Sequence, residues 1–265
     1  MMGDKRHIIV LDYPGRRAEA GIAALDLESQ GFIPQYLLSR HLPVEPEADR
    51  YTASLYAHAT PGGEVAAVMA YCAAGALAGV YAELVRAASG ERPPVICFDA
   101  EPCTVRDLVE CYAEALRQIP EDPDGAPSPP VDVASLIHQP RLLVGTVRED
   151  LTRRMLRALV SDGLRRADVE SAVTRSVDIH LSWLTHLLAC FDASTSRRGG
   201  IAFHVQSKGN ADLGRWSVGE QAATVRIDSS RSDLLRHPET RSAVLSFLRE
   251  NIQTDRGDRQ WPSGR

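Results

Sequence analysis

The sequence contains no pair of cysteines at the C-x-x-C spacing typical of many zinc sites. It has five cysteines, and these are Cys72, Cys97, Cys103, Cys111 and Cys190. Because their number is odd and no short spacing joins them, neither a disulfide framework nor a zinc site is expected. All five are predicted to be free thiols, and no metal and no resident cofactor is expected.

The chain also lacks long apolar runs and an excess of basic residues. No apolar segment reaches membrane-spanning length, and the N-terminal residues lead directly into a strand-like segment without the apolar core of a secretion signal. The 30 basic residues are scattered and are outnumbered by 35 acidic ones, which gives a formal net charge of -5. We therefore expect a cytoplasmic protein that binds neither membranes nor nucleic acid.

The pattern of apolar residues predicts an α/β protein. A chain of 265 residues that is 44% hydrophobic can bury one full core, with room for an inserted subdomain. Short apolar runs predict strands over residues 7–12, 64–71, 94–99, 201–206 and 223–228. Helix-forming segments cover residues 49–60, 73–89, 101–117, 148–159, 167–191 and 238–251. Strands that alternate with helices across short loops predict a parallel sheet.

Cys72 lies at the corner between the strand 64–71 and the helix 73–89. The free N–H groups at the start of that helix favour negative charge, either on a thiolate or on the oxyanion of a reacting carbonyl. Asp99 ends the next strand, so it lies at the same edge of a parallel sheet, where ligands and chemistry collect. A buried cysteine beside a helix is, however, often only a small apolar side chain, and this alternative stays open.

The corner from Ala70 through Cys72 to Ala74 resembles the Gly-x-Ser-x-Gly nucleophile elbow of α/β-hydrolases. Nearly the whole chain resembles the stand-alone and terminal thioesterases of polyketide and nonribosomal peptide assembly lines. The matching features are a Pro-Gly turn after the first strand, Phe98-Asp99-Ala-Glu-Pro, a helical block before the penultimate strand, Gly214-Arg-Trp216 and Leu234-Leu235-Arg-His-Pro-Glu. A cysteine nucleophile is also similar to that of cysteine-using acyltransferases and cyclases of such pathways, including Dieckmann cyclases that release tetramic acids.

This resemblance implies an α/β-hydrolase fold, with a mostly parallel central sheet flanked by helices and a helical lid insertion. The core would comprise residues 1–104 and 199–265, and the lid residues 105–198. Cys72 would be the nucleophile and Asp99 the catalytic acid. The backbone N–H of Ala73 would bind the oxyanion with help from Tyr13, because Pro14 has no N–H to give.

The chain departs from these thioesterases at the position of the catalytic histidine, where Arg231 stands instead. An arginine stays protonated and cannot act as a general base. His237, a few residues further on, and His204, in the penultimate strand, are alternative bases, although each is more often structural at such a place. Arg231 would then act by charge, favouring a thiolate on Cys72 or binding the oxyanion.

The expected function is therefore acyl transfer or cyclising release rather than ordinary hydrolysis. A thiolate attacks a thioester unaided, whereas water needs a base. The resemblance implies an acyl carrier protein as partner, with phosphopantetheine present only as part of that substrate, and a small-molecule or peptide acceptor. The alternatives are a type II thioesterase that hydrolyses carrier-bound thioesters and a non-catalytic binding protein of the same fold.

Overall fold

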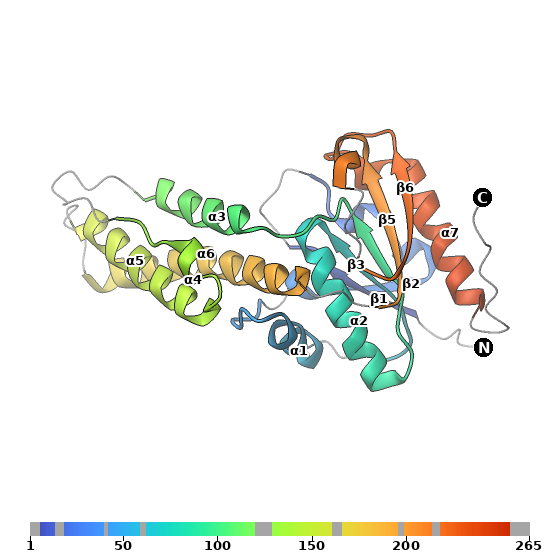
Figure 1. Ribbon diagram of the computed structural model, residues 1–265, viewed down its shortest axis with the longest axis horizontal. Coiled ribbons are helices and arrows are strands. Elements are labelled where there is room, and N and C mark those ends of the chain that lie inside the picture. The colour runs from blue at the N-terminus through green and yellow to red at the C-terminus, as the bar shows by residue number, and fades with distance from the viewer. Residues whose placement is uncertain are drawn as a thin grey trace. The chain divides into compact units, whose positions relative to one another are not determined.

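The computed structural model (Figure 1) describes residues 6–13, 19–39, 42–58, 62–119, 129–160, 166–195, 199–213 and 218–254. The chain divides into two compact units. The first consists of Met1–His41, Thr52–Pro102 and Ser194–Arg265, and the second of Leu42–Tyr51 and Cys103–Ala193. Two features of the sequence resemblance, the Pro-Gly turn at residues 14–15 and the segment 214–216, lie outside the described residues.

The first unit is built on a six-stranded sheet with the order β2-β1-β3-β4-β5-β6, in which every neighbouring pair is parallel. The strands are β1 (Arg6–Leu11), β2 (Phe32–Tyr36), β3 (Val65–Tyr71), β4 (Val95–Phe98), β5 (Ile201–Ser207) and β6 (Gln221–Ile227). The strand before Cys72 is thus internal to the sheet. The predicted α/β fold class, with a parallel central sheet flanked by helices, is confirmed.

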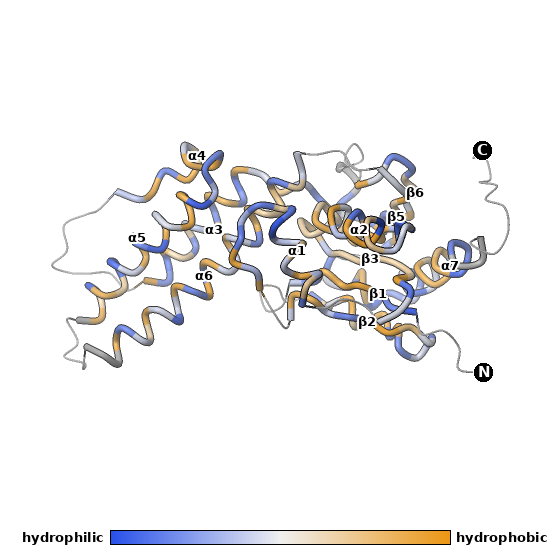
Figure 2. The backbone as a smooth tube through the Cα atoms, turned by 90° about the horizontal axis from the view of Figure 1, so that it is seen from below, coloured by the Kyte–Doolittle hydropathy of each residue, from blue (hydrophilic) through white to orange (hydrophobic). Residues whose placement is uncertain are grey.

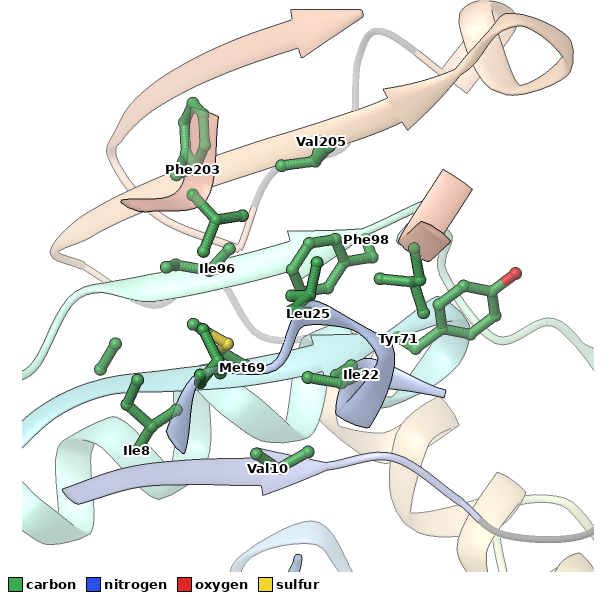
Figure 3. Packing of buried hydrophobic residues seen from close by; sticks show 14 of the residues in the cluster. Ile8, Val10, Ile22, Leu25, Met69, Tyr71, Ile96, Phe98, Phe203 and Val205 are labelled. Atoms are coloured by element: carbon green, nitrogen blue, oxygen red, sulfur yellow. The ribbon is translucent and has the colours of Figure 1, made fainter. Parts of the chain in front are cut away.

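One face of this sheet carries the main apolar cluster (Figure 3). Alternate residues of neighbouring strands supply it, because successive side chains of a strand point to opposite faces. Those labelled in the figure from β1, β3, β4 and β5 are Ile8, Val10, Met69, Tyr71, Ile96, Phe98, Phe203 and Val205. The 3₁₀ turn Ile22–Leu25 and helix α7 (Pro238–Thr254) pack against this layer, and the rings of Phe203 and Phe247 stack at 4.6 Å.

Helix α2 (Gly75–Ser89) packs against β3 and β4, and none of its residues belongs to that cluster. The small residues from Gly75 to Gly79 are all buried, which lets the helix lie close to the strands. In Figure 2 the internal strands β1 and β3 are mostly hydrophobic, as expected for strands covered on both faces. Strand β3 and helix α2, which flank Cys72 in the sequence, therefore pack closely against each other.

The second unit contains α3 (Val105–Arg117), α4 (Val133–Leu136), α5 (Pro140–Val160) and α6 (Arg166–Ser194). The buried carboxyl group of Asp150 organises it, accepting hydrogen bonds from Tyr112, Arg153 and Arg154. The hydroxyl group of Tyr51, from α1 (Ala48–His58), hydrogen-bonds His186 at 3.0 Å. The role of this unit as a lid stays a prediction. None of the described helices is long and apolar enough to cross a membrane.

Two predicted helix starts are wrong, and each has a local cause. Helix α3 begins at Val105 instead of residue 101, because Pro102 disfavours helical geometry at Glu101 and Thr104 caps the helix in a capping box with Asp107. Helix α5 begins at Pro140, eight residues before the predicted start at residue 148, since proline fits the first turn of a helix. The first correction leaves Glu101 in the loop that follows β4.

Gly200, which precedes β5, offers a test of the packing around the sheet. Its φ is +94°, and an added Cβ would lie 2.1 Å from Nη1 of Arg92. We expect Gly200→Ala to lower the free energy of unfolding by about 2 kcal/mol, since the backbone is left-handed and Arg92 must move. Chemical denaturation measures this. Gly209→Ala is the control, because its Cβ would meet nothing within 4 Å, and equal losses would contradict the prediction.

Candidate active site

The corner between β3 and α2 holds Cys72 in a left-handed conformation. Tyr71 ends the strand, Cys72–Ala74 form a 3₁₀ turn, and Gly75 begins the helix. Cys72 has a φ of 54°, which is uncommon for a residue other than glycine. A sharp, strained strand-to-helix turn is what presents a nucleophile at the end of a sheet. The turn forms here although alanines occupy the two positions that are glycine in the Gly-x-Ser-x-Gly elbow.

Two side chains, Glu101 and Arg231, contact the sulfur of Cys72. Nη2 of Arg231 lies 2.9 Å from Sγ and also donates to Oε1 of Glu101 at 3.0 Å. The thiol of Cys72 in turn donates to the same Oε1 at 3.1 Å. Tyr71 fixes Arg231, because its hydroxyl oxygen accepts from Nε at 3.1 Å and its ring lies 5.6 Å from Cζ. We call Tyr71, Cys72, Glu101 and Arg231 the thiol cluster.

The cluster holds Cys72 as a thiol. Burial raises the pKa of Cys72 to about 12, and the charge of Glu101 adds to this effect. Arg231 and a hydrogen bond from the backbone of Ala73 lower the pKa only in part. The expectation of an unaided thiolate is therefore wrong for this resting arrangement. Burial alone would lower the pKa of Arg231, but its contacts with Cys72, Tyr71 and Glu101 raise it, so the guanidinium stays charged.

Asp99, the predicted acid, lies at the predicted edge of the sheet but faces a different group of atoms. It is fully buried, and its Oδ1 accepts from the backbone N–H of Ser207 at 2.7 Å and from Nδ2 of Asn210 at 3.1 Å. Its Oδ2 is buried without a hydrogen-bond partner in the described part of the chain. Cys72 and Arg231 are not among its contacts. Asp99 therefore anchors the segment that follows β5.

Neither alternative histidine is a partner of the Cys72 sulfur. His204 is buried inside β5, opposite Cys97 of β4, and burial lowers its pKa. His237 ends the 3₁₀ turn Leu234–Arg236 and uses its backbone to bond Leu234. The contacts of the sulfur within the described residues are Glu101 and Arg231, besides the N–H of Ala73.

The structure shows a contact with Cys72 for one of the two predicted oxyanion donors, Ala73, and only a position in the sheet for the other, Tyr13. The N–H of Ala73 lies at the sulfur of Cys72, in the first turn after the strand. Tyr13 follows β1, whose Leu11 is paired with Ala70 of β3, so Tyr13 and Cys72 both lie two residues beyond this pair. Its contribution to an oxyanion site stays a prediction. Over the described ranges, no group of three or more His, Cys, Asp or Glu side chains is arranged to hold a metal ion.

The pattern of apolar residues and helix formers does not identify Glu101 as part of the site. A helix start at residue 101 would have made Glu101 an ordinary acidic residue of a first helical turn. The signal that identifies it is Pro102, which keeps Glu101 in the loop after a strand that neighbours the elbow strand. The same pattern does not identify Tyr71 either, because it indicates only that Tyr71 is the last residue of a buried strand.

No protein-family model and no curated protein matches the sequence. Among solved structures, the Vlm2 thioesterase domain, bound with a dodecadepsipeptide, superposes with a TM-score of 0.48 at 17% identity over 96% of this chain and 93% of its own. ClbQ from the colibactin NRPS/PKS pathway gives 0.44 at 13% identity, over 94% of this chain and 98% of its own. RedJ, a thioesterase from the prodiginine biosynthetic pathway in Streptomyces coelicolor, gives 0.40 at 14% identity, over 93% and 90%. Vlm2 and RedJ are thioesterases, but at such scores the chemistry of this chain has to be argued from its own residues.

Proposed function

We propose that Cys72 accepts an acyl group from a thioester and passes it to a nucleophile other than water. The observation that carries this proposal is a cysteine at a left-handed strand-to-helix corner, with a guanidinium group 2.9 Å from its sulfur. Attack by sulfur on a thioester exchanges one thioester for another, so the acyl group keeps its activation. The N–H of Ala73 is available to stabilise the oxyanion that forms.

Within the described residues no histidine contacts the sulfur of Cys72, and this supports transfer over hydrolysis. Water is a poor nucleophile and needs a base to activate it at the acyl carbon. Thiols, amines and stabilised carbanions attack a thioester more readily, and they are the acceptors that this site suits. An acyl group carried by a phosphopantetheine arm of a carrier protein is the proposed donor, and the fold of natural-product thioesterases is compatible with it.

A non-catalytic protein that binds an acyl chain or a carrier protein is the second candidate. The observation in its favour is the pKa of Cys72, which at about 12 leaves the thiol protonated at neutral pH. In that case Arg231 and Glu101 would only stabilise the fold around an inert thiol. Acyl loading separates the two candidates, because a binding protein forms no covalent adduct.

The test is incubation of the whole protein with S-octanoyl-N-acetylcysteamine or an octanoyl-loaded carrier protein, followed by intact-mass measurement. We expect one octanoyl adduct, mapped by proteolysis to the peptide that contains Cys72. The adduct should persist in buffer and be discharged by hydroxylamine, a primary amine or a thiol. The other four cysteines are buried and serve as internal controls. No adduct, or an adduct on another cysteine, would exclude this function.

A further inference from the structure

Acyl transfer from a protonated cysteine poses a problem that the described geometry resolves. Because burial raises the pKa of Cys72 to about 12, the side chain is a protonated thiol near pH 7.5. The proton must therefore leave as the sulfur attacks. In many acyl-transfer sites a histidine takes such a proton, but among the residues that the structure describes no histidine contacts this sulfur.

Glu101 lies where a proton acceptor is needed. Its Oε1 accepts the thiol hydrogen of Cys72 at 3.1 Å, within the reach of a general base for a sulfur donor. The carboxyl group is held in place by Arg231, and Glu101 lies in the loop that directly follows β4. The side chain is 34% exposed, so it also reaches solvent and incoming groups.

We propose that Glu101 is the catalytic base that takes the proton of Cys72, a role that rests on the proposed acyl transfer. In the first step the proton moves from Sγ to Glu101 while sulfur bonds to the thioester carbon. The tetrahedral intermediate then collapses, the donor C–S bond breaks, and the departing thiolate takes the proton back from Glu101. In the second step the acceptor attacks the acyl carbon, the bond between that carbon and Sγ breaks, and the proton that the acceptor loses passes to the released Cys72 thiolate.

The charges around the sulfur suit this proton transfer. Among the described residues, the charged groups that contact the Cys72 sulfur are Glu101 from the loop after β4 and Arg231 from the loop after β6, and the hydroxyl group of Tyr71 from β3 binds Arg231. Glu101 raises the pKa of the thiol only while it is negatively charged. Once Glu101 holds the proton, Arg231 faces the thiolate without an opposing carboxylate. The proton thus moves inside a cluster of constant net charge.

The test compares two reactions of Cys72 in a Glu101→Gln variant. Alkylation by iodoacetamide reports the thiolate fraction, and it should become about tenfold faster at pH 7.5, because a negative neighbour is removed while Arg231 remains. Acyl loading from S-octanoyl-N-acetylcysteamine should become about 100-fold slower, because the base is lost. Opposite changes in the two rates are the signature of a base. Glu91→Gln, an exposed change of equal charge, should alter neither rate.

Glu101→Ala provides a second, independent measurement. Added formate should restore a substantial part of its loading rate, since a small carboxylate can occupy the emptied place beside the thiol. A role in folding alone would not respond to formate. Loading that rises together with alkylation, or that is unchanged in the glutamine variant, would overturn the assignment of Glu101 and leave the proposed function standing. Failure of the wild-type protein to load would overturn both.

Discussion

Cys72→Ala and Cys72→Gly are both expected to lose acyl loading completely, while the glycine variant is about 1 kcal/mol more stable than the alanine variant. Both changes remove the sulfur, so the loss of its contacts with Glu101 and Arg231 is common to them. They differ in how well they tolerate the φ of 54° at this position, because glycine adopts it without strain and alanine does not. The difference in stability therefore measures the strain stored at the corner.

Loading is followed by intact mass and stability by chemical denaturation. Cys97→Ala is the matched control, because Cys97 is a fully buried cysteine of β4 outside the thiol cluster. Its replacement should lower stability and leave loading intact. A loaded Cys72→Ala protein would rule out the covalent route, and an alanine variant as stable as the glycine variant would rule out stored strain. Strained backbone positions cluster at functional sites, so the left-handed φ of Cys72 supports a functional role for this corner.

The sheet was readable from the sequence because its strands are short apolar runs separated by glycine and proline. Five predicted strands match β1, β3, β4, β5 and β6 within about two residues at each end. The long helices of the second unit were also predicted. Their ends were less accurate, since the start of α5 depends on a proline that fits as well in a loop as in a first helical turn.

For the site, the sequence predicts only which residues lie at the same edge of the sheet. Parallel strands bring Cys72, Asp99 and the loop with Arg231 to one end of the sheet, and the structure indeed brings Arg231 to the sulfur. Which way Asp99 faces depends on Ser207 and Asn210, which lie more than 100 residues away in the sequence. The pKa of Cys72 is raised by burial and by the charge of Glu101 and lowered by the charge of Arg231. The sequence around Cys72 does not predict which of these opposing effects is larger.

Asp99→Ala is expected to lower the free energy of unfolding by about 3 kcal/mol, because it leaves two buried donors without an acceptor. These donors are the backbone N–H of Ser207 and the amide of Asn210, both in segments that Asp99 ties to the end of β4. Chemical denaturation measures the loss. Asp99→Asn is the control, because asparagine keeps an acceptor oxygen and tolerates the left-handed φ of 41°. It should be less destabilised than the alanine variant.

The asparagine variant also decides between an anchoring and a catalytic role for Asp99. In a triad, replacing the acid by its amide leaves the geometry intact and lowers the rate by about 10⁴-fold. Here Asp99 contacts neither Cys72, Glu101 nor Arg231, so Asp99→Asn should load acyl groups at close to the wild-type rate. A large loss of loading in a stable Asp99→Asn protein would show that Asp99 acts on the reaction. If Asp99→Ala loads acyl groups at the wild-type rate but is less stable, Asp99 is a structural anchor. The proton of Cys72 is then left to Glu101.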